Sequence, residues 1–122
     1  MLLDDDHRAV QDAVRAFVQA EVAPHAARWD REHHFPAAEL KGLAALGCYG
    51  VAVPVEWDGA GLDYLALAVI LEEIAAGDGG TSTVVSVNTC PVCSILMAWA
   101  NDAQKARWRW ATRSARAGRA SS

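Results

Sequence analysis

The sequence predicts an all-α fold, a bundle of about five helices followed by an irregular C-terminal tail. Hydrophobic residues make up 52% of the 122 residues and many of them are alanine, which has the highest helix propensity. Apolar residues recur at intervals of three and four, the spacing of one helical face. Glycine, proline and short polar residues separate these segments, as they do at helix ends. The length suits one domain with a modest core.

The first predicted helix begins at about Asp5. Aspartates at the start of a helix are stabilised by the positive end of its dipole. Pro24 has no backbone N–H, so the helix should end or kink there, with a short second piece through Trp29. The apolar residues of the first piece share one face: Val10, Val14, Phe17, Val18 and Val22.

The next predicted helix begins at Pro36, which suits a first turn, and closes on Gly47. Its buried side is formed by Leu40, Leu43 and Leu46. Residues 49–55 are expected to be a short extended stretch, followed by a glycine-rich loop. Asp63 can then cap a helix that ends at Gly77.

Two further helices complete the predicted bundle. Thr81 or Ser82 can cap the long apolar segment 83–100. Asn101, followed three residues later by Gln104, is typical of a capping box that opens a last helix. No internal repeat indicates a second domain.

The charges of the chain are unevenly distributed. All 15 acidic residues lie before Lys105, together with only five of the 11 basic residues. The acidic body argues against a nucleic acid as partner, and the basic end lacks a motif for one. The uninterrupted apolar stretches are too short to span a membrane, and the N-terminus lacks the positive charge of a signal peptide. We therefore expect a cytoplasmic protein with no membrane or nucleic-acid partner.

Cys90-Pro91-Val92-Cys93 is the sharpest local motif. A strand at 84–87 and a helix at 94–100 would give the arrangement of thioredoxin-like redox sites, where a helix N-terminus lowers the pKa of the first thiol. Against this hypothesis, too little chain follows for the remaining strands of such a fold. The alternative is two small apolar residues on a buried helix that is bent by Pro91. Three cysteines without a secretion signal favour reduced thiols over disulfides.

No metal or phosphate site is predicted. The four histidines include no i, i+4 pair on a helix, and His33-His34 is expected in a solvated turn. The segment 77–82 superficially resembles a phosphate-binding loop, but it lacks a lysine and follows a helix rather than a strand. We interpret it as a helix end, a turn and the next helix start.

Several segments resemble the motifs of one enzyme family, in order along the chain. Glu21–Pro36 is similar to the pattern E-[IV]-x-P-x-A-x-x-[WY]-D-x-x-x-x-[FY]-P. Pro54–Gly61 is similar to P-x-E-[YW]-G-G-x-G, with aspartate in place of one glycine, a change that a turn tolerates. Leu71–Ala75 resembles the motif EEIA. From about Leu3 to Trp108 the chain thus resembles the N-terminal helical domain of the acyl-CoA dehydrogenases.

The resemblance implies a larger enzyme with a helical domain, a β-barrel and a four-helix bundle. Such an enzyme binds FAD and removes hydrogens from Cα and Cβ of an acyl-CoA substrate. A glutamate takes the α-proton while flavin N5 accepts a hydride. In the family, that glutamate and most flavin and CoA contacts lie beyond the segment that this chain matches. We therefore expect no catalytic, cofactor-binding or metal-binding residue in this chain.

The resemblance also implies that the helix matching residues 83–96 is one wall of the acyl-chain pocket. The candidate pocket residues are Ser86, Val87, Cys90 and Cys93. Ordinary core packing is the alternative role for each of them. Pro91 departs from the family pattern and should bend this helix. Of the acidic pair Glu72-Glu73, at most one side chain can face inward, because adjacent helical positions point about 100° apart; we interpret Glu73 as a structural partner.

The resemblance divides the chain at Trp108. Residues 1–108 correspond to the family domain, and residues 109–122 form a basic tail that we expect to be non-homologous and disordered. Our hypothesis for the change is a frameshift or truncation, and a genuinely different C-terminus is the alternative. We expect the chain alone to be inactive, to hold no FAD, and to self-associate or bind another protein chain through exposed apolar faces. The rival functions are a non-catalytic interaction module or remnant, and a thiol redox protein using Cys90 and Cys93.

Overall fold

The fold comes from a computed structural model that describes residues 3–108. The predicted basic tail, residues 109–122, lies outside the described residues. Within them, every regular element is helical. In chain order these elements are α1 (Asp5–Glu21), a 3-10 turn (Ala23–His25), α2 (Ala26–Glu32), α3 (Ala37–Ala45), a 3-10 turn (Val55–Trp57), α4 (Tyr64–Gly77), α5 (Gly79–Val87), a π-helical turn (Asn88–Cys93), α6 (Ser94–Trp99) and α7 (Asp102–Trp108).

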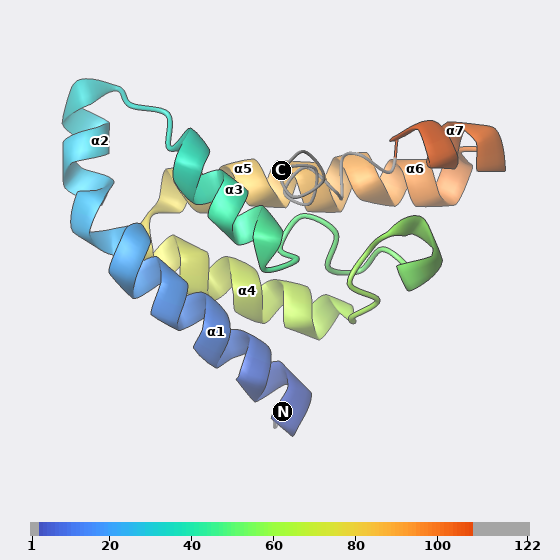
Figure 1. The fold of residues 1–122 in the computed structure, drawn as a ribbon, viewed down its shortest axis with the longest axis horizontal. Helices are drawn as coiled ribbons and strands as arrows, with labels where there is room; N and C mark the ends of the chain where they lie inside the picture. Colours follow the sequence, from blue (N-terminus) through green and yellow to red (C-terminus); the bar gives the residue numbers. More distant parts are fainter. Residues whose placement is uncertain (1–2, 109–122) are drawn as a thin grey trace, which may run out of the picture.

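The elements form a single helical bundle (Figure 1). Helices α1 and α4 pack side by side, and α5 packs on α4. The segment Gly79–Trp99 is one continuous helix of 21 residues that includes α5, the π-helical turn and α6. With α2 taken as the second piece of the first helix, the described part contains the five helical units that the sequence predicts. Pro24 lies in the 3-10 turn between α1 and α2, as expected from its missing N–H.

Polar side chains cap three of the helices, two of them, at Asp63 and Asn101, as predicted. Asp4 accepts a backbone N–H at 2.8 Å in the capping box of α1. Asp63 accepts the backbone N–H of Ala66 at 2.8 Å at the start of α4. At the start of α7, Asn101 accepts the backbone N–H of Gln104 at 2.9 Å, and Gln104 accepts that of Asn101 at 3.0 Å. These caps satisfy N–H groups that a first helical turn leaves unpaired.

The start of α5 differs from the prediction. The N-cap is Asp78, whose carboxylate accepts the Thr81 backbone N–H at 2.9 Å and the Thr81 hydroxyl at 2.6 Å. The expected caps, Thr81 and Ser82, already lie inside the helix, which begins at Gly79. The prediction placed the glycine pair in a turn because glycine disfavours helix interiors. An aspartate cap directly before the pair offsets that preference at the first turn.

The connection between α3 and α4 is a folded loop, so the expected extended stretch at residues 49–55 is wrong. Its backbone groups bond within the loop; for example, the N–H of Leu62 donates to the carbonyl of Val51 at 2.8 Å. A strand needs a neighbouring strand to pair its backbone groups, and the described residues provide none. Asp58 has a φ of +64°, which agrees with the expectation that it accepts a turn conformation in place of glycine.

The long helix differs from the expectation that every apolar stretch is too short to span a membrane. By length and composition alone, Gly79–Trp99 is long and apolar enough to cross a membrane. The prediction considered only uninterrupted apolar stretches, and uncharged polar residues interrupt them in this segment. The whole segment nevertheless carries no charged residue. Core helices of soluble proteins meet the same criterion. This helix contributes Val85 and Cys93 to the buried core.

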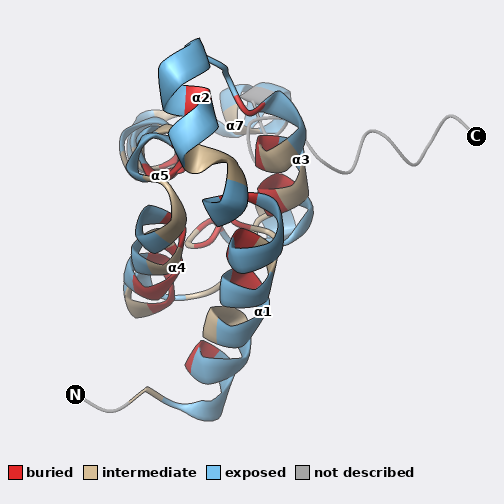
Figure 2. Cartoon of the chain, turned by 90° about the vertical axis from the view of Figure 1, so that its left-hand side faces the viewer, coloured by how far each residue is buried: buried red, intermediate tan, exposed pale blue. Residues whose placement is uncertain are grey.

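The core lies between α1, α3, α4 and α5, whose facing sides carry the buried residues (Figure 2). Leu40 and Leu43 are buried as predicted, but Leu46 is 46% exposed. Its side chain leaves the predicted face because α3 ends at Ala45 and the chain turns at Gly47, where φ is +87°. The largest fully buried side chains are Leu43, Ile74, Val14, Val22, Val51, Val85, Thr81 and Cys48.

Gly77, the last residue of α4, lets α4 approach α1 closely. A Cβ at this position would overlap Cγ1 of Val18 on α1, and a β-branched side chain has little rotamer freedom with which to yield. We predict that Gly77→Ala lowers the free energy of unfolding by about 1–3 kcal/mol, as over-packing does. Chemical denaturation followed by circular dichroism measures this change.

Gly79→Ala is the matched control, because a Cβ there meets no heavy atom within 4 Å. Removing this glycine from a helix start should leave stability unchanged or raise it slightly. Equal losses for the two variants would contradict the account of the α1–α4 contact.

Candidate functional site

The long helix contains a proline, and the helix accommodates it in a π-helical turn. Pro91 has no N–H to donate and its ring would clash with a carbonyl one turn earlier in a regular α-helix. The bend expected at Pro91 takes the form of the π-helical turn Asn88–Cys93. Such turns occur frequently at functional sites. Because residues 84–87 are helical rather than extended, the strand of the thioredoxin-like hypothesis is absent from this segment.

Polar groups of the π-helical turn bind the loop between α3 and α4 at the carbonyl of Tyr49. The Asn88 side-chain amide donates to that carbonyl at 3.0 Å. The Thr89 hydroxyl lies 3.3 Å from it and 2.9 Å from the carbonyl of Val85. The Cys93 thiol lies 3.7 Å from the same Tyr49 oxygen. Three side chains thus converge on one backbone oxygen, which anchors the loop to the turn.

The sequence analysis did not identify Thr89 or assign a role to Asn88. Both are polar residues in an otherwise apolar segment, two and three positions before a proline. That combination was the available signal, because a buried polar side chain needs a hydrogen-bond partner. The partner itself lies about 40 residues earlier in an irregular loop, and no local pattern indicates it.

A groove of about 340 Å³ opens beside the π-helical turn. We call it the Cys93 groove. Its walls are mostly apolar, and they come from the α3–α4 loop, the start of α4 and the long helix. The lining residues are Ala52, Val53, Pro54, Tyr64, Thr89, Cys93, Ser94, Met97 and Ala98.

The four candidate pocket residues do not converge on this groove. Cys93 lines it and is only 3% exposed. Val87 lies outside it and is 53% exposed. Ser86 and Cys90 are half-buried, and Cys90 packs against the hydrophobic core. The long helix therefore offers two different surfaces, and the role of these four residues at an acyl chain stays a prediction.

Two of the three thiols, those of Cys48 and Cys93, are buried. Burial raises the pKa of the Cys93 thiol and raises that of Cys48 to about 12. A nucleophilic thiolate requires the opposite shift, which positive neighbours or a free helix N-terminus provide. Cys93 instead lies at the end of the π-helical turn, with helix on both sides. The thiol redox hypothesis therefore loses the strand and the helix N-terminus on which it rested.

Glu73 is a structural partner, as the sequence analysis interpreted it. Its carboxylate accepts hydrogen bonds from Arg15 Nη2 at 2.6 Å and Arg15 Nε at 3.1 Å. These bonds join α4 to α1 and lower the pKa of the Glu73 carboxyl group. A carboxylate held in this way is a weaker base than a free one.

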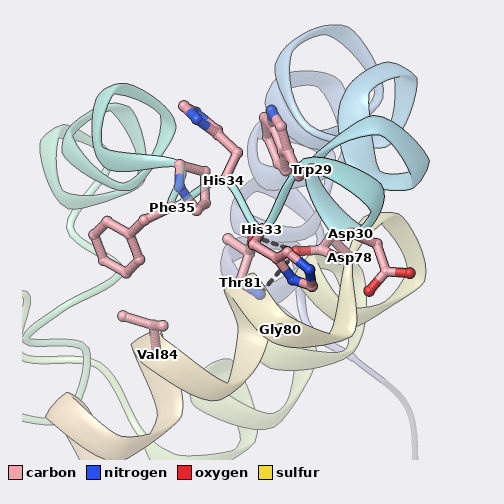
Figure 3. A pocket seen from close by; sticks show the side chains of 10 residues that line it. Trp29, Asp30, His33, His34, Phe35, Asp78, Gly80, Thr81 and Val84 are labelled. Atoms are coloured by element: carbon pink, nitrogen blue, oxygen red, sulfur yellow. Dashed lines mark hydrogen bonds between the residues drawn. The ribbon is translucent and has the colours of Figure 1, made fainter.

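A second hollow of about 340 Å³ lies between the α2–α3 connection and α5 (Figure 3). We call it the Trp29 hollow. His33 is exposed with a left-handed φ of +53°, in agreement with the solvated turn expected there. The ring of His34 lies 6.1 Å from that of Trp29. The residues around it are Trp29, Asp30, His33, His34, Phe35, Pro36, Asp78, Gly80, Thr81 and Val84.

The Trp29 hollow does not resemble a metal or phosphate site. Asp78 already caps the α5 N-terminus by accepting the Thr81 N–H with its carboxylate, so a negative charge stands where a phosphate would bind. Residues 77–82 are a helix end followed directly by the next helix start, without the turn that we expected between them. In the part of the chain that the structure describes, no three histidine, cysteine or acidic side chains are grouped for a metal ion.

Comparison with known proteins identifies a family match over most of the chain. The sequence model described as "Acyl-CoA dehydrogenase, N-terminal domain" matches residues 4–114. The match runs past the boundary that we expected at Trp108, into residues outside the described part.

Among its relatives, the human mitochondrial short-chain specific acyl-CoA dehydrogenase is 39% identical over 106 residues, which are 87% of this chain and 26% of the relative. The bovine protein of the same name is 38% identical over the same shares. A probable acyl-CoA dehydrogenase, FadE25 of Mycobacterium tuberculosis, is 31% identical over 84% of this chain and 26% of its own length. The chain therefore spans about a quarter of the length of these relatives.

A solved structure described as an electron transferring flavoprotein of Acidaminococcus fermentans has a similar fold. The two superimpose with a TM-score of 0.89 at 22% sequence identity, over 94% of this chain and 30% of the other. At this identity the similarity concerns the fold alone. It supports the predicted all-α helical domain.

The anchor at the Tyr49 carbonyl can be tested by removing one hydroxyl. We predict that Thr89→Val lowers the free energy of unfolding by about 1–3 kcal/mol, because the buried carbonyl groups of the loop and of Val85 lose a hydrogen-bond donor. Thr83→Val is the control, since its hydroxyl donates to Gly79 at 3.0 Å on the exposed side of the same helix. That change should stay within about 0.5 kcal/mol. Equal effects in urea denaturation would refute the anchor.

Proposed function

Because the chain belongs to the acyl-CoA dehydrogenase family through its N-terminal helical domain, we propose that it contributes one wall of the acyl-chain pocket of an FAD-dependent acyl-CoA dehydrogenase. The reaction of such an enzyme is the removal of hydrogens from Cα and Cβ of an acyl-CoA thioester. We propose further that the chain does not perform this reaction alone. The observation that carries the proposal is the family match over residues 4–114, on a chain that spans 26% of its relatives.

The long helix has the chemistry that a pocket wall requires. One side packs on the core, and the other presents apolar side chains to solvent, including Val87 and Ile95. Pockets for small molecules are lined mainly by such side chains. Ser86, Val87, Cys90 and Cys93 are the residues that we propose at the acyl chain. Val87 and Cys93 would meet it on different sides of the helix, so a ligand that contacts both must pass around the π-helical turn.

Neither residue of the acidic pair Glu72-Glu73 is placed as a base for the α-proton. Glu73 is bound to Arg15 in two hydrogen bonds that keep it ionised and in place. Its neighbour Glu72 is exposed on the surface of α4. Catalysis of this kind requires a carboxylate fixed against the substrate to within a fraction of an ångström, and neither glutamate meets that requirement.

The two hollows named above, in the described part of the chain, also do not fit FAD. Neither the Cys93 groove nor the Trp29 hollow is lined by lysine or arginine. The Trp29 hollow, which lies at the helix start, carries Asp30 and Asp78, and carboxylates repel the pyrophosphate of the cofactor. A pyrophosphate normally binds at a helix N-terminus with free N–H groups, whereas Asp78 caps this one. We therefore assign no step of the reaction to this chain.

The first prediction of this proposal concerns activity. The purified chain should be colourless after incubation with excess FAD and removal of unbound cofactor. Addition of an acyl-CoA and an artificial electron acceptor should give no turnover above a protein-free blank. Turnover that is lost in Glu73→Gln would overturn the proposal, since it would assign the base to this domain.

The second prediction concerns association. Trp99 is 85% exposed, and Ile95 lies one turn before it on the same open side of the long helix. Exposed apolar surfaces of this kind bind partners or aggregate. The chain should therefore self-associate in multi-angle light scattering and bind a hydrophobic dye. The double variant Ile95→Lys/Trp99→Lys should shift it toward the monomer.

The association experiment also bears on the rival function, a non-catalytic interaction module. Phe35→Lys is a matched control, because this exposed residue lies on the α2–α3 connection rather than on the long helix. It should leave the association unchanged. A wild-type monomer without dye binding would contradict the prediction and would leave these exposed side chains without a partner-binding role.

A further inference from the structure

His7 connects the starts of the two helices that pack most extensively. It lies in the first turn of α1 and is only 9% exposed. Its Nε2 atom lies 2.9 and 3.0 Å from the two carboxylate oxygens of Asp63, the N-cap of α4. The two residues are 56 positions apart in the chain. This is a tertiary contact between helix N-termini and not a local cap alone.

The other ring nitrogen faces two different groups of the same residue. Nδ1 lies 3.4 Å from the backbone nitrogen of Asp4 and 2.8 Å from its Oδ1 atom. A neutral imidazole that donates from Nε2 to Asp63 can only accept at Nδ1, so it pairs with the Asp4 N–H. A protonated imidazole donates from both nitrogens and pairs with both carboxylates. The geometry accommodates either state, but the protonated ring gains a second charged hydrogen bond.

Asp63, the partner of His7, is adjacent in sequence to a residue that lines the Cys93 groove. Asp63 holds the α4 start by accepting the Ala66 N–H at 2.8 Å while it binds His7. The next residue, Tyr64, lines the Cys93 groove. A change in the hold on Asp63 therefore acts directly on the position of the groove wall.

We propose that His7 is a proton-dependent latch between the N-termini of α1 and α4, which holds the α4 start, and with it Tyr64 at the groove, more tightly when the imidazole is protonated than when it is neutral. The charged groups that face the ring are Asp63 from α4 and Asp4 and Asp6 from its own helix start. All three are acids, so every one of them favours the charged ring. The latch is a property of this chain's own fold and does not depend on the proposed function.

The pH range of the latch follows from the two partners. The hydrogen bond to Asp63 raises the pKa of His7 above its ordinary value of 6.5, with further contributions from Asp4 and Asp6 that exceed the opposing effect of burial. A raised pKa contributes stability that is fully present below pH 6.5 and is lost as the pH rises through the folded-state value. The Ala66 N–H and then His7 lower the pKa of Asp63 below 3.8. Its contribution is present above pH 3.8 and is lost as the pH falls through the lowered value. The contribution of the latch to stability is thus complete between about pH 3.8 and 6.5, and it weakens as the pH rises through the raised pKa of His7.

The experiment is an NMR titration of the full chain from pH 5 to 9, following the His7 imidazole and the Tyr64 ring. His7 should titrate with a midpoint above 6.5, and the Tyr64 resonances should move with the same midpoint. In Asp63→Asn the His7 midpoint should fall, although asparagine retains the helix cap. In His7→Gln the Tyr64 resonances should not respond over this range. His34→Gln is the control, since this exposed imidazole lies on the α2–α3 connection and should leave both midpoints unchanged.

Thermal unfolding gives a second, independent readout. The melting temperature of the wild type should exceed that of His7→Gln at pH 6, and the difference should shrink at pH 9. A His7 midpoint at or below 6.5, Tyr64 resonances that ignore the His7 titration, or a melting difference that is the same at both pH values would each overturn the proposal.

Discussion

A proline inside a partly buried helix is the constraint around which this domain is organised. Pro91 cannot continue a regular α-helix, and the chain accommodates it in a π-helical turn at the middle of the 21-residue helix. The turn directs Asn88, Thr89 and Cys93 toward the carbonyl of Tyr49. The irregular loop between α3 and α4 thereby gains a fixed position, and the Cys93 groove forms between the loop and the helix.

The rest of the bundle positions this helix by close packing and by charge. Gly77 allows α4 to lie directly against α1, and Arg15 binds Glu73 across the same pair of helices. At the other end of the pair, His7 binds Asp63. Because α5 packs in turn on α4, the wall that the long helix presents depends on contacts made by the first helix. Every residue in these contacts packs against another residue or is hydrogen-bonded to one, so none of them is available for catalysis.

The sequence predicted the helices well because their signals are local. Apolar spacing and the caps at Asp63 and Asn101 act within one or two turns, so a single stretch of sequence contains the whole signal. The predictions that were wrong also have physical causes. Leu46 carries an apolar side chain at the right spacing, but the helix ends one residue before it. The loop at residues 49–55 has the composition of a strand, but no strand is available to pair with it in the described part.

The candidate site was less predictable than the fold. The resemblance to a family indicated the long helix as a pocket wall, which stays a prediction. Which side chains share a face of this helix depends on the π-helical turn, which shifts the register after Asn88. Of the four residues named from the sequence, only Cys93 lines the groove. Thr89 was missed because its partners belong to a distant loop. The spacing of apolar residues predicted which helix a residue belongs to, but it did not predict which residues it contacts across the bundle.

The central claim is that the π-helical turn and the α3–α4 loop form one cooperative unit held at the Tyr49 carbonyl. Native-state hydrogen exchange measures this most directly, because it reports the free energy with which each segment opens. The account predicts that amides of residues 49–53 and 88–96 exchange with a common opening free energy and respond together to denaturant. Exchange of the loop at a much lower free energy, while the long helix stays protected, would contradict it.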